Sequence, residues 1–83
     1  MEPVFPFDLA LPARGQGSLT QALHQQLRAA ILDGRLAAGA TLPATRQVAA
    51  LLGIARNTVV AAYDLLMAEG YVVPKPGAKA TVA

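Results

Sequence analysis

The chain has 83 residues, 54% of them hydrophobic, and a formal net charge of +2 at neutral pH. This length allows one domain, and the hydrophobic content supports a folded core rather than disorder. Because the chain has no cysteine, a disulfide scaffold and a thiolate zinc site are excluded. No apolar stretch reaches the ~20 residues that a membrane helix needs, and the start of the chain is unlike a signal peptide. We therefore expect a soluble, cytoplasmic domain with no membrane partner.

Residues 1–18 form an N-terminal arm without a helical pattern, in which three prolines precede two closely spaced glycines. Residues 5–11 alternate enough for a short strand at a sheet edge, where proline is tolerated. Two interpretations stay open for this arm: a short edge strand, or an ordered segment without one.

The first helix is predicted by apolar residues that recur at spacings of three and four between Leu19 and Ile31. Ser18 or Thr20 can cap its start, and Gly34 ends it. Two leucines of the following loop are expected to enter the core: Leu36 and Leu42.

Two further helices are predicted on either side of a tight turn, over residues 44–52 and 55–69. Gly53 suits the left-handed conformation just past a helix end, and the small side chain of Ala49 lets the two helices approach. The buried stripe of the third helix is expected to contain Val59, Ala62, Tyr63 and Leu66.

The C-terminal segment predicts two short strands, residues 71–73 and 80–82, around a turn that contains proline and glycine. Three helices followed by a hairpin form a winged helix-turn-helix, which is mainly α within the α+β class. We expect this domain to cover residues 19–83, with the helix-turn-helix at about 45–64 and the wing at about 71–83.

A polar cluster, Arg56, Asn57 and Thr58, lies at the predicted start of the third helix. In a helix-turn-helix this turn enters the DNA major groove, where arginine pairs with guanine and asparagine with adenine. We assign Thr58 to a phosphate. The competing interpretation is that these residues cap the helix or face solvent. Arg46, near the start of the second helix, makes this competing interpretation weaker. Arginine at a helix start opposes the helix dipole, so its presence there suggests a function other than folding.

Other basic residues give weaker indications of DNA contact. Lys75 and Lys79 flank the hairpin turn, and a basic turn can reach the minor groove or its phosphates. An exposed loop with solubilising lysines is an equal alternative. Arg35 either contacts the DNA backbone or only caps the first helix.

An enzyme is not expected. The chain has one serine and one histidine, Ser18 and His24, which lie six residues apart and so on different faces of the first helix. No acid is placed to orient the histidine, which is expected at the surface, and the glycines of the arm do not form a phosphate-binding loop.

The region from residue 19 to residue 83 resembles the N-terminal winged helix domain of the GntR family of bacterial transcription regulators. The resemblance lies in "AILDGRLAAGATLPATRQVA", "LGIARNTVVAAYDLL" and "AEGYV". The form "ARNTVVAAYDLLMAEGYV" is most similar to the MocR branch, whose members carry a large aminotransferase-like domain that binds pyridoxal phosphate. The resemblance implies that this chain is a DNA-binding domain cut from such a regulator, with the cofactor expected only in the missing C-terminal domain.

Carried over by position, the resemblance implies DNA contacts by Arg46, Arg56, Asn57, Thr58 and the wing glycine, Gly77. Two alanines depart from the family pattern. Ala44 stands where a capping serine is frequent, so we expect a less firmly started second helix. Ala55 stands where a serine or threonine often precedes the arginine. In the wing, Lys79 replaces a second glycine.

The leading hypothesis is sequence-specific binding of double-stranded DNA by the DNA-binding domain of a bacterial transcription regulator. Family members act as dimers, so a homodimer is expected for the full regulator and a monomer or weak dimer for this chain. The alternative is a winged-helix module that binds a partner protein, for which an exposed apolar patch would be needed. The residues available for such a patch are Val60, Ala61, Leu65 and Met67.

Overall fold

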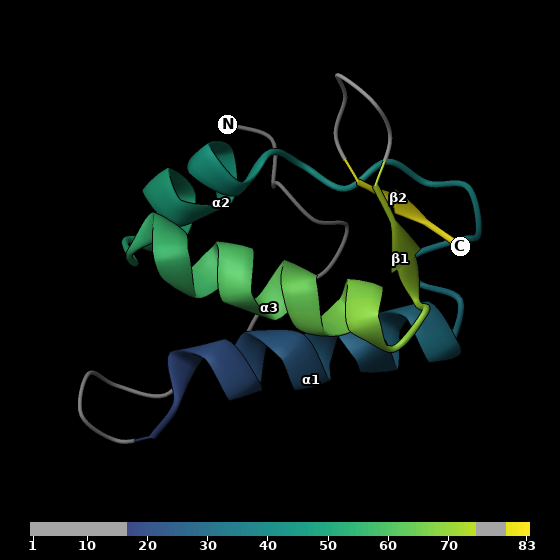
Figure 1. Cartoon of the computed structure of the whole chain (residues 1–83), viewed down its shortest axis with the longest axis horizontal. Coiled ribbons are helices and arrows are strands. Elements are labelled where there is room, and N and C mark those ends of the chain that lie inside the picture. Colours follow the sequence, from purple (N-terminus) through teal and green to yellow (C-terminus); the bar gives the residue numbers. More distant parts are fainter. Residues whose placement is uncertain (1–16, 75–79) are drawn as a thin grey trace.

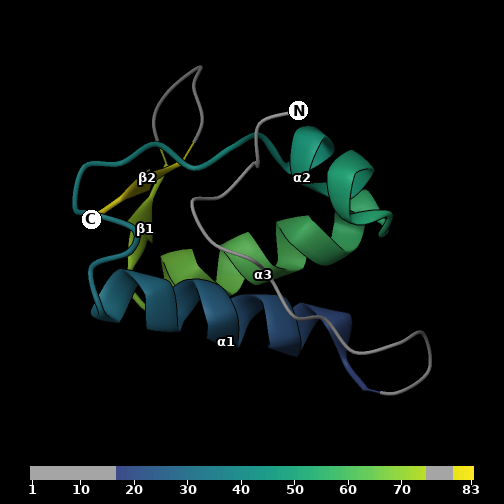
Figure 2. The same cartoon turned by 180° about the vertical axis from the view of Figure 1, so that it is seen from behind.

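The computed structural model describes residues 17–74 and 80–83, and the fold is the predicted winged helix-turn-helix (Figure 1). Its elements in chain order are α1 (Leu19–Leu32), α2 (Thr45–Leu52), α3 (Arg56–Ala68), β1 (Val72–Val73) and β2 (Thr81–Val82). Helix α3 lies between α1 and α2, as both views show (Figures 1 and 2). The strand predicted for residues 5–11 lies outside the described residues.

Helix α1 begins with a side-chain cap. The Ser18 hydroxyl accepts a hydrogen bond from the backbone N–H of Gln21 at 3.1 Å, so Ser18, not Thr20, is the capping residue. This bond satisfies one of the N–H groups that a helix start otherwise leaves without a partner. The helix ends at Leu32, Asp33 is its C-terminal capping residue, and Gly34 follows with φ of +87°, which confirms the predicted stop.

The turn between α2 and α3 depends on glycine and alanine. Gly53 has φ of +68° and ψ of +33°, a left-handed conformation that costs little only without a Cβ. The next N–H, of Ile54, donates to the carbonyl of Ala49 at 3.1 Å. Ala49 itself is buried, as expected for a small residue at the contact between the two helices. This turn therefore sets the position of α3 relative to α2.

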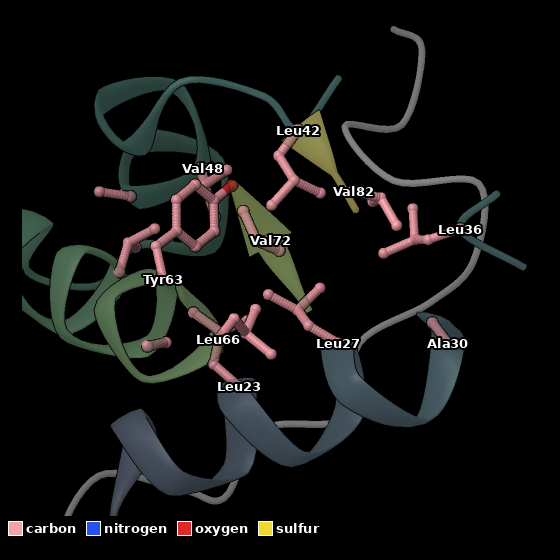
Figure 3. Close-up of a cluster of buried hydrophobic side chains, with 13 residues drawn as sticks. Leu23, Leu27, Ala30, Leu36, Leu42, Val48, Tyr63, Leu66, Val72 and Val82 are labelled. Carbon is pink, nitrogen blue, oxygen red and sulfur yellow. The ribbon is translucent and has the colours of Figure 1, made fainter. Parts of the chain in front are cut away.

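The core gathers side chains from all three helices, the hairpin and the loop before α2 (Figure 3). The predicted stripe of α3 is buried in full, and both loop leucines enter the core as predicted. The Tyr63 hydroxyl donates to the carbonyl of Pro43 at 2.8 Å, which ties α3 to the loop that leads into α2. Burial raises the pKa of the Tyr63 hydroxyl, so it remains a neutral donor.

The wing has a third pairing partner that the sequence did not suggest. Strands β1 and β2 pair antiparallel, with Val72 opposite Val82. The loop before α2 also pairs with β2: Leu42 donates to Ala80 at 2.8 Å, and Val82 donates to Ala40 at 2.8 Å. The base of the wing is thus fixed to the loop that precedes α2. Each strand is one residue shorter than predicted, as is α2, and α3 is one residue shorter at each end.

Two predictions about His24 of α1 are wrong: that it lies at the surface, and that no acid is placed to orient its ring. The sequence places His24 at the surface, but only 12% of its side chain is exposed, and its Nε2 lies 2.5 Å from a carboxylate oxygen of Glu69. Glu69 follows the last residue of α3, so the contact joins α1 to the end of α3. Within the described part of the chain, no helix is long and apolar enough to cross a membrane.

Candidate nucleic-acid interface

The starts of α2 and α3 meet at one place on the surface. Arg56 is the first residue of α3, and its Nε–H donates to the hydroxyl of Thr45, the first residue of α2, at 3.3 Å. Arg46 is the next residue of α2 and is exposed. The two arginines that the sequence singled out therefore occupy neighbouring helix starts, although they lie ten positions apart in the chain.

The other two residues of the polar cluster follow Arg56 on the first turn of α3. Asn57 is exposed, and Thr58 is half-buried. The backbone N–H of Thr58 donates to the carbonyl of Ala55 at 3.0 Å, which closes this turn. The structure thus brings together the four residues assigned to the two helix starts.

Neither of these helix starts is capped by a side chain. The residues at the capping positions are Ala44 and Ala55, and neither makes a side-chain hydrogen bond to its helix. Asn57 and Thr58 lie inside α3, so they do not occupy its capping position. The first turns of α2 and α3 contain no acidic residue either, so neither helix offsets the positive end of its own dipole. Helix starts without an acidic residue in their own first turn favour an anion.

The carboxylates of the described residues lie elsewhere. Glu69 contacts His24, Asp33 pairs with Arg35, and Asp64 is the ninth residue of α3. Within residues 17–74 and 80–83, no carboxylate forms an ion pair with Arg46 or Arg56. Among the described residues, no acidic side chain therefore offsets the positive charge at the two helix starts.

Arg35 lies apart from this pair of helix starts. It follows the C-terminal end of α1, and that end is opposite the start of α3 (Figure 1). Its Nε lies 2.9 Å from a carboxylate oxygen of Asp33, and its backbone N–H donates to the same carboxylate at 3.1 Å. These contacts hold the pKa of Asp33 below its ordinary value of 3.8. The structure does not bring Arg35 together with Arg46 and Arg56.

The predicted contact residues of the wing, Lys75, Gly77 and Lys79, lie outside the described residues. One residue of the interface was missed at the sequence level. Thr45 carried no signal of its own, because a threonine in a first helical turn is common and its contact with Arg56 spans 11 residues.

The residues suggested for the apolar patch of a protein-binding module are mostly not large exposed ones. Of the four residues available for it, only Leu65 is among the large exposed ones, with 41% exposure, and Met67 packs against the core. Among the described residues, no group of three or more potential metal ligands is present.

A chain with three helices, a two-stranded wing and two arginine-bearing helix starts is a winged helix-turn-helix domain. The family model for bacterial regulatory proteins of the gntR family matches residues 19–82. The chain belongs to the GntR family of bacterial regulatory proteins and spans its winged-helix DNA-binding domain. Membership in this family makes the chain a DNA-binding domain rather than an enzyme.

Two curated relatives place the chain near the MocR branch. It is 49% identical over 61 residues to the probable rhizopine catabolism regulatory protein MocR of Rhizobium meliloti, covering 74% of this chain and 12% of that protein. It is 45% identical over 73 residues to the transcriptional regulator TauR of Rhodobacter capsulatus, covering 88% of this chain and 15% of that protein. The chain therefore spans a small fraction of the length of these relatives.

Two solved structures share the fold. YtrA from Sulfolobus acidocaldarius, a GntR-family transcription factor, matches with a TM-score of 0.81 and 27% identity over 89% of this chain and 78% of that chain. The DNA-binding domain of AraR, solved in complex with operator ORE1, matches with a TM-score of 0.74 over 95% of this chain and 96% of that chain. The AraR domain is 18% identical, so it supports the fold alone.

Proposed function

We propose that the domain binds double-stranded DNA with the start of α3 in the major groove and the start of α2 against the sugar–phosphate backbone. The observation that carries this proposal is the pair of adjacent, uncapped helix starts, each with an exposed arginine that no described carboxylate neutralises. DNA supplies both a dense row of phosphates and base edges that arginine recognises.

Each residue of the interface has a distinct proposed role. Arg56 donates two hydrogen bonds to a guanine, and Asn57 recognises an adjacent adenine. Thr58, which is half-buried and close to the backbone, donates to a phosphate, and Arg46 contacts a phosphate from the start of α2. For the wing, contact of Lys75, Gly77 and Lys79 with the minor groove or its phosphates stays a prediction from the sequence.

The regulators that the chain is similar to are much longer than the chain itself. We infer that the dimer contacts, and any pyridoxal phosphate, belong to other parts of such a regulator. The 83-residue chain then acts as a monomer or weak dimer on each half-site, and it needs no cofactor to bind DNA. A cytoplasmic location follows from the proposed ligand, because bacterial DNA lies there.

A salt titration of binding to duplex DNA tests the proposal. Contact with about four to six phosphates predicts a slope of roughly −3 to −5 in a plot of log affinity against log salt concentration. Binding is first measured on a random duplex at low salt and then on duplexes selected from a random pool. A slope near zero, or the absence of any shift with random duplex at low salt, contradicts the proposal.

A further inference from the structure

We propose that Thr45 is a positioning residue for DNA recognition: its hydroxyl orients the Arg56 guanidinium so that the two terminal nitrogens of Arg56 face a base. The inference rests on the proposed function, because it assigns a role to Thr45 in the same DNA interface. It is drawn from the contact between the Arg56 Nε–H and the Thr45 hydroxyl oxygen, which are 3.3 Å apart.

The contact joins two helices at their first residues. Thr45 is the first residue of α2 and is half-buried, whereas Arg56 is the first residue of α3 and is exposed. The guanidinium of an exposed arginine otherwise samples many rotamers, and it loses side-chain entropy when binding immobilises it. A hydrogen bond to its Nε removes part of that freedom before DNA arrives.

The atom that Thr45 engages limits how Arg56 can bind a base. A guanidinium has five N–H donors, of which Nε carries one and the two terminal nitrogens carry four. With Nε–H directed to Thr45, the two terminal nitrogens remain for the O6 and N7 acceptors of a guanine. Thr45 therefore favours recognition of guanine by the two terminal nitrogens over recognition by Nε and one terminal nitrogen. The Thr45 hydroxyl thus influences base choice although it does not itself touch the base.

The hydroxyl of Thr45 has no competing role in starting its own helix. The capping position of α2 is occupied by Ala44, and no side chain caps the helix. The hydrogen bond is at the long end of the usual range, and one of its partners is exposed, so its effect is modest. A loss of about three- to tenfold in affinity is the scale expected for a single hydrogen bond of this kind.

Thr45→Val tests the inference, because it removes the hydroxyl and keeps the branched shape. The ligand is the duplex that the wild-type 83-residue chain selects from a random pool, with random duplex as the non-specific reference. Thr45→Val should weaken binding to the selected duplex by about three- to tenfold and change binding to random duplex by less than about twofold. Thr45→Ser, which restores the hydroxyl, should recover wild-type affinity for the selected duplex.

A double-mutant cycle separates positioning from direct contact. In an Arg56→Ala background, Thr45→Val should have no further effect on affinity, because the residue that it orients is gone. Thr20→Val, the same substitution on the first turn of α1, is the matched control and should leave affinity unchanged. Thr45→Ala is a second variant that should behave as Thr45→Val, and circular dichroism of each variant verifies that the helices are formed.

Three results would overturn the inference. They are wild-type affinity of Thr45→Val for the selected duplex, an equal loss on selected and random duplex, and a loss that persists in the Arg56→Ala background. In each of these cases the wild-type chain still binds DNA, so the proposed function stands. Failure of the wild-type chain to bind any duplex overturns the proposed function instead.

Discussion

The capping residue before helix α1 is Ser18, whose hydroxyl caps the first turn, whereas the capping positions before α2 and α3 hold Ala44 and Ala55, which provide no side-chain cap. The capped start has a partner for one of its N–H groups within its own chain. The uncapped starts carry arginine in their first turns, where the helix dipole disfavours a positive charge. The difference fits the proposed function, in which the start of α1 serves the fold and the charges at the starts of α2 and α3 contact DNA.

Arg35, on the one hand, and Arg46 and Arg56, on the other, make the same contrast. Arg35 is paired with Asp33 at the end of α1, where it completes a local turn. No described carboxylate pairs with Arg46 or Arg56. An arginine with an acidic partner in its own chain has its charge compensated, while one without such a partner can contribute fully to binding an anion.

Arg56→Ala should have the largest effect on DNA binding of any single substitution at the two helix starts. We expect a loss of about 1–3 kcal/mol on the selected duplex and a relaxed preference at one base position, with little change in the free energy of unfolding. Competition between duplexes that differ at single positions measures the affinity and the base preference, and urea denaturation measures the stability. Arg28→Ala removes the same charge from α1 and is the control. An equal loss on every duplex would instead make Arg56 a phosphate contact.

Ala55→Asp should convert the start of α3 into a start like that of α1. A carboxylate at the capping position should raise the free energy of unfolding by about 1 kcal/mol. The same charge should repel DNA and weaken binding on the order of tenfold. Thermal melting and a binding titration on one sample measure the two effects. Ala55→Ser, which adds a cap without charge, should stabilise the domain and keep its affinity for DNA. Unchanged DNA binding in Ala55→Asp would contradict the proposed difference between the start of α1 and the start of α3.

Ser18→Ala should affect stability and leave DNA binding alone. Loss of the hydrogen bond from the Gln21 backbone N–H to the Ser18 hydroxyl should lower the free energy of unfolding by about 1 kcal/mol. Urea denaturation measures this loss, and the affinity of the folded variant for the selected duplex should equal that of the wild type. Ser18→Thr retains the hydroxyl and should stay close to the wild-type stability. A parallel fall in DNA affinity would show that the start of α1 also contributes to binding.

The Asp33–Arg35 pair should give the smallest effect, visible as a pH dependence of stability. The pKa of Asp33 is lowered in the folded protein, so the unfolded chain takes up a proton first as the pH falls. The contribution of the pair is therefore present above the ordinary pKa of 3.8 and is lost at lower pH. The difference in unfolding free energy between wild type and Asp33→Asn should shrink as the pH falls from about 5 to about 2; a constant difference would contradict this.

The positions of most candidate site residues at the helix starts were predictable, because their signals are local. The polar cluster from Arg56 to Thr58 follows a glycine turn, and the four-residue spacing between Ala49 and Gly53 predicts that turn from the sequence alone. Thr45 was not predictable, because its role depends on a contact between the first residues of two different helices. His24 was wrongly placed for the same reason: its partner Glu69 is 45 residues away.

The sequence by itself determined the three helices, the turn at Gly53, the buried stripe of α3 and the family. Periodicity, glycine conformation and motif spacing are properties of neighbouring residues, so they can be recognised without coordinates. Only the tertiary structure decided that the loop before α2 pairs with β2 and that Thr45 contacts Arg56. These interactions depend on how packing of the core brings distant segments together, and no local pattern encodes that geometry.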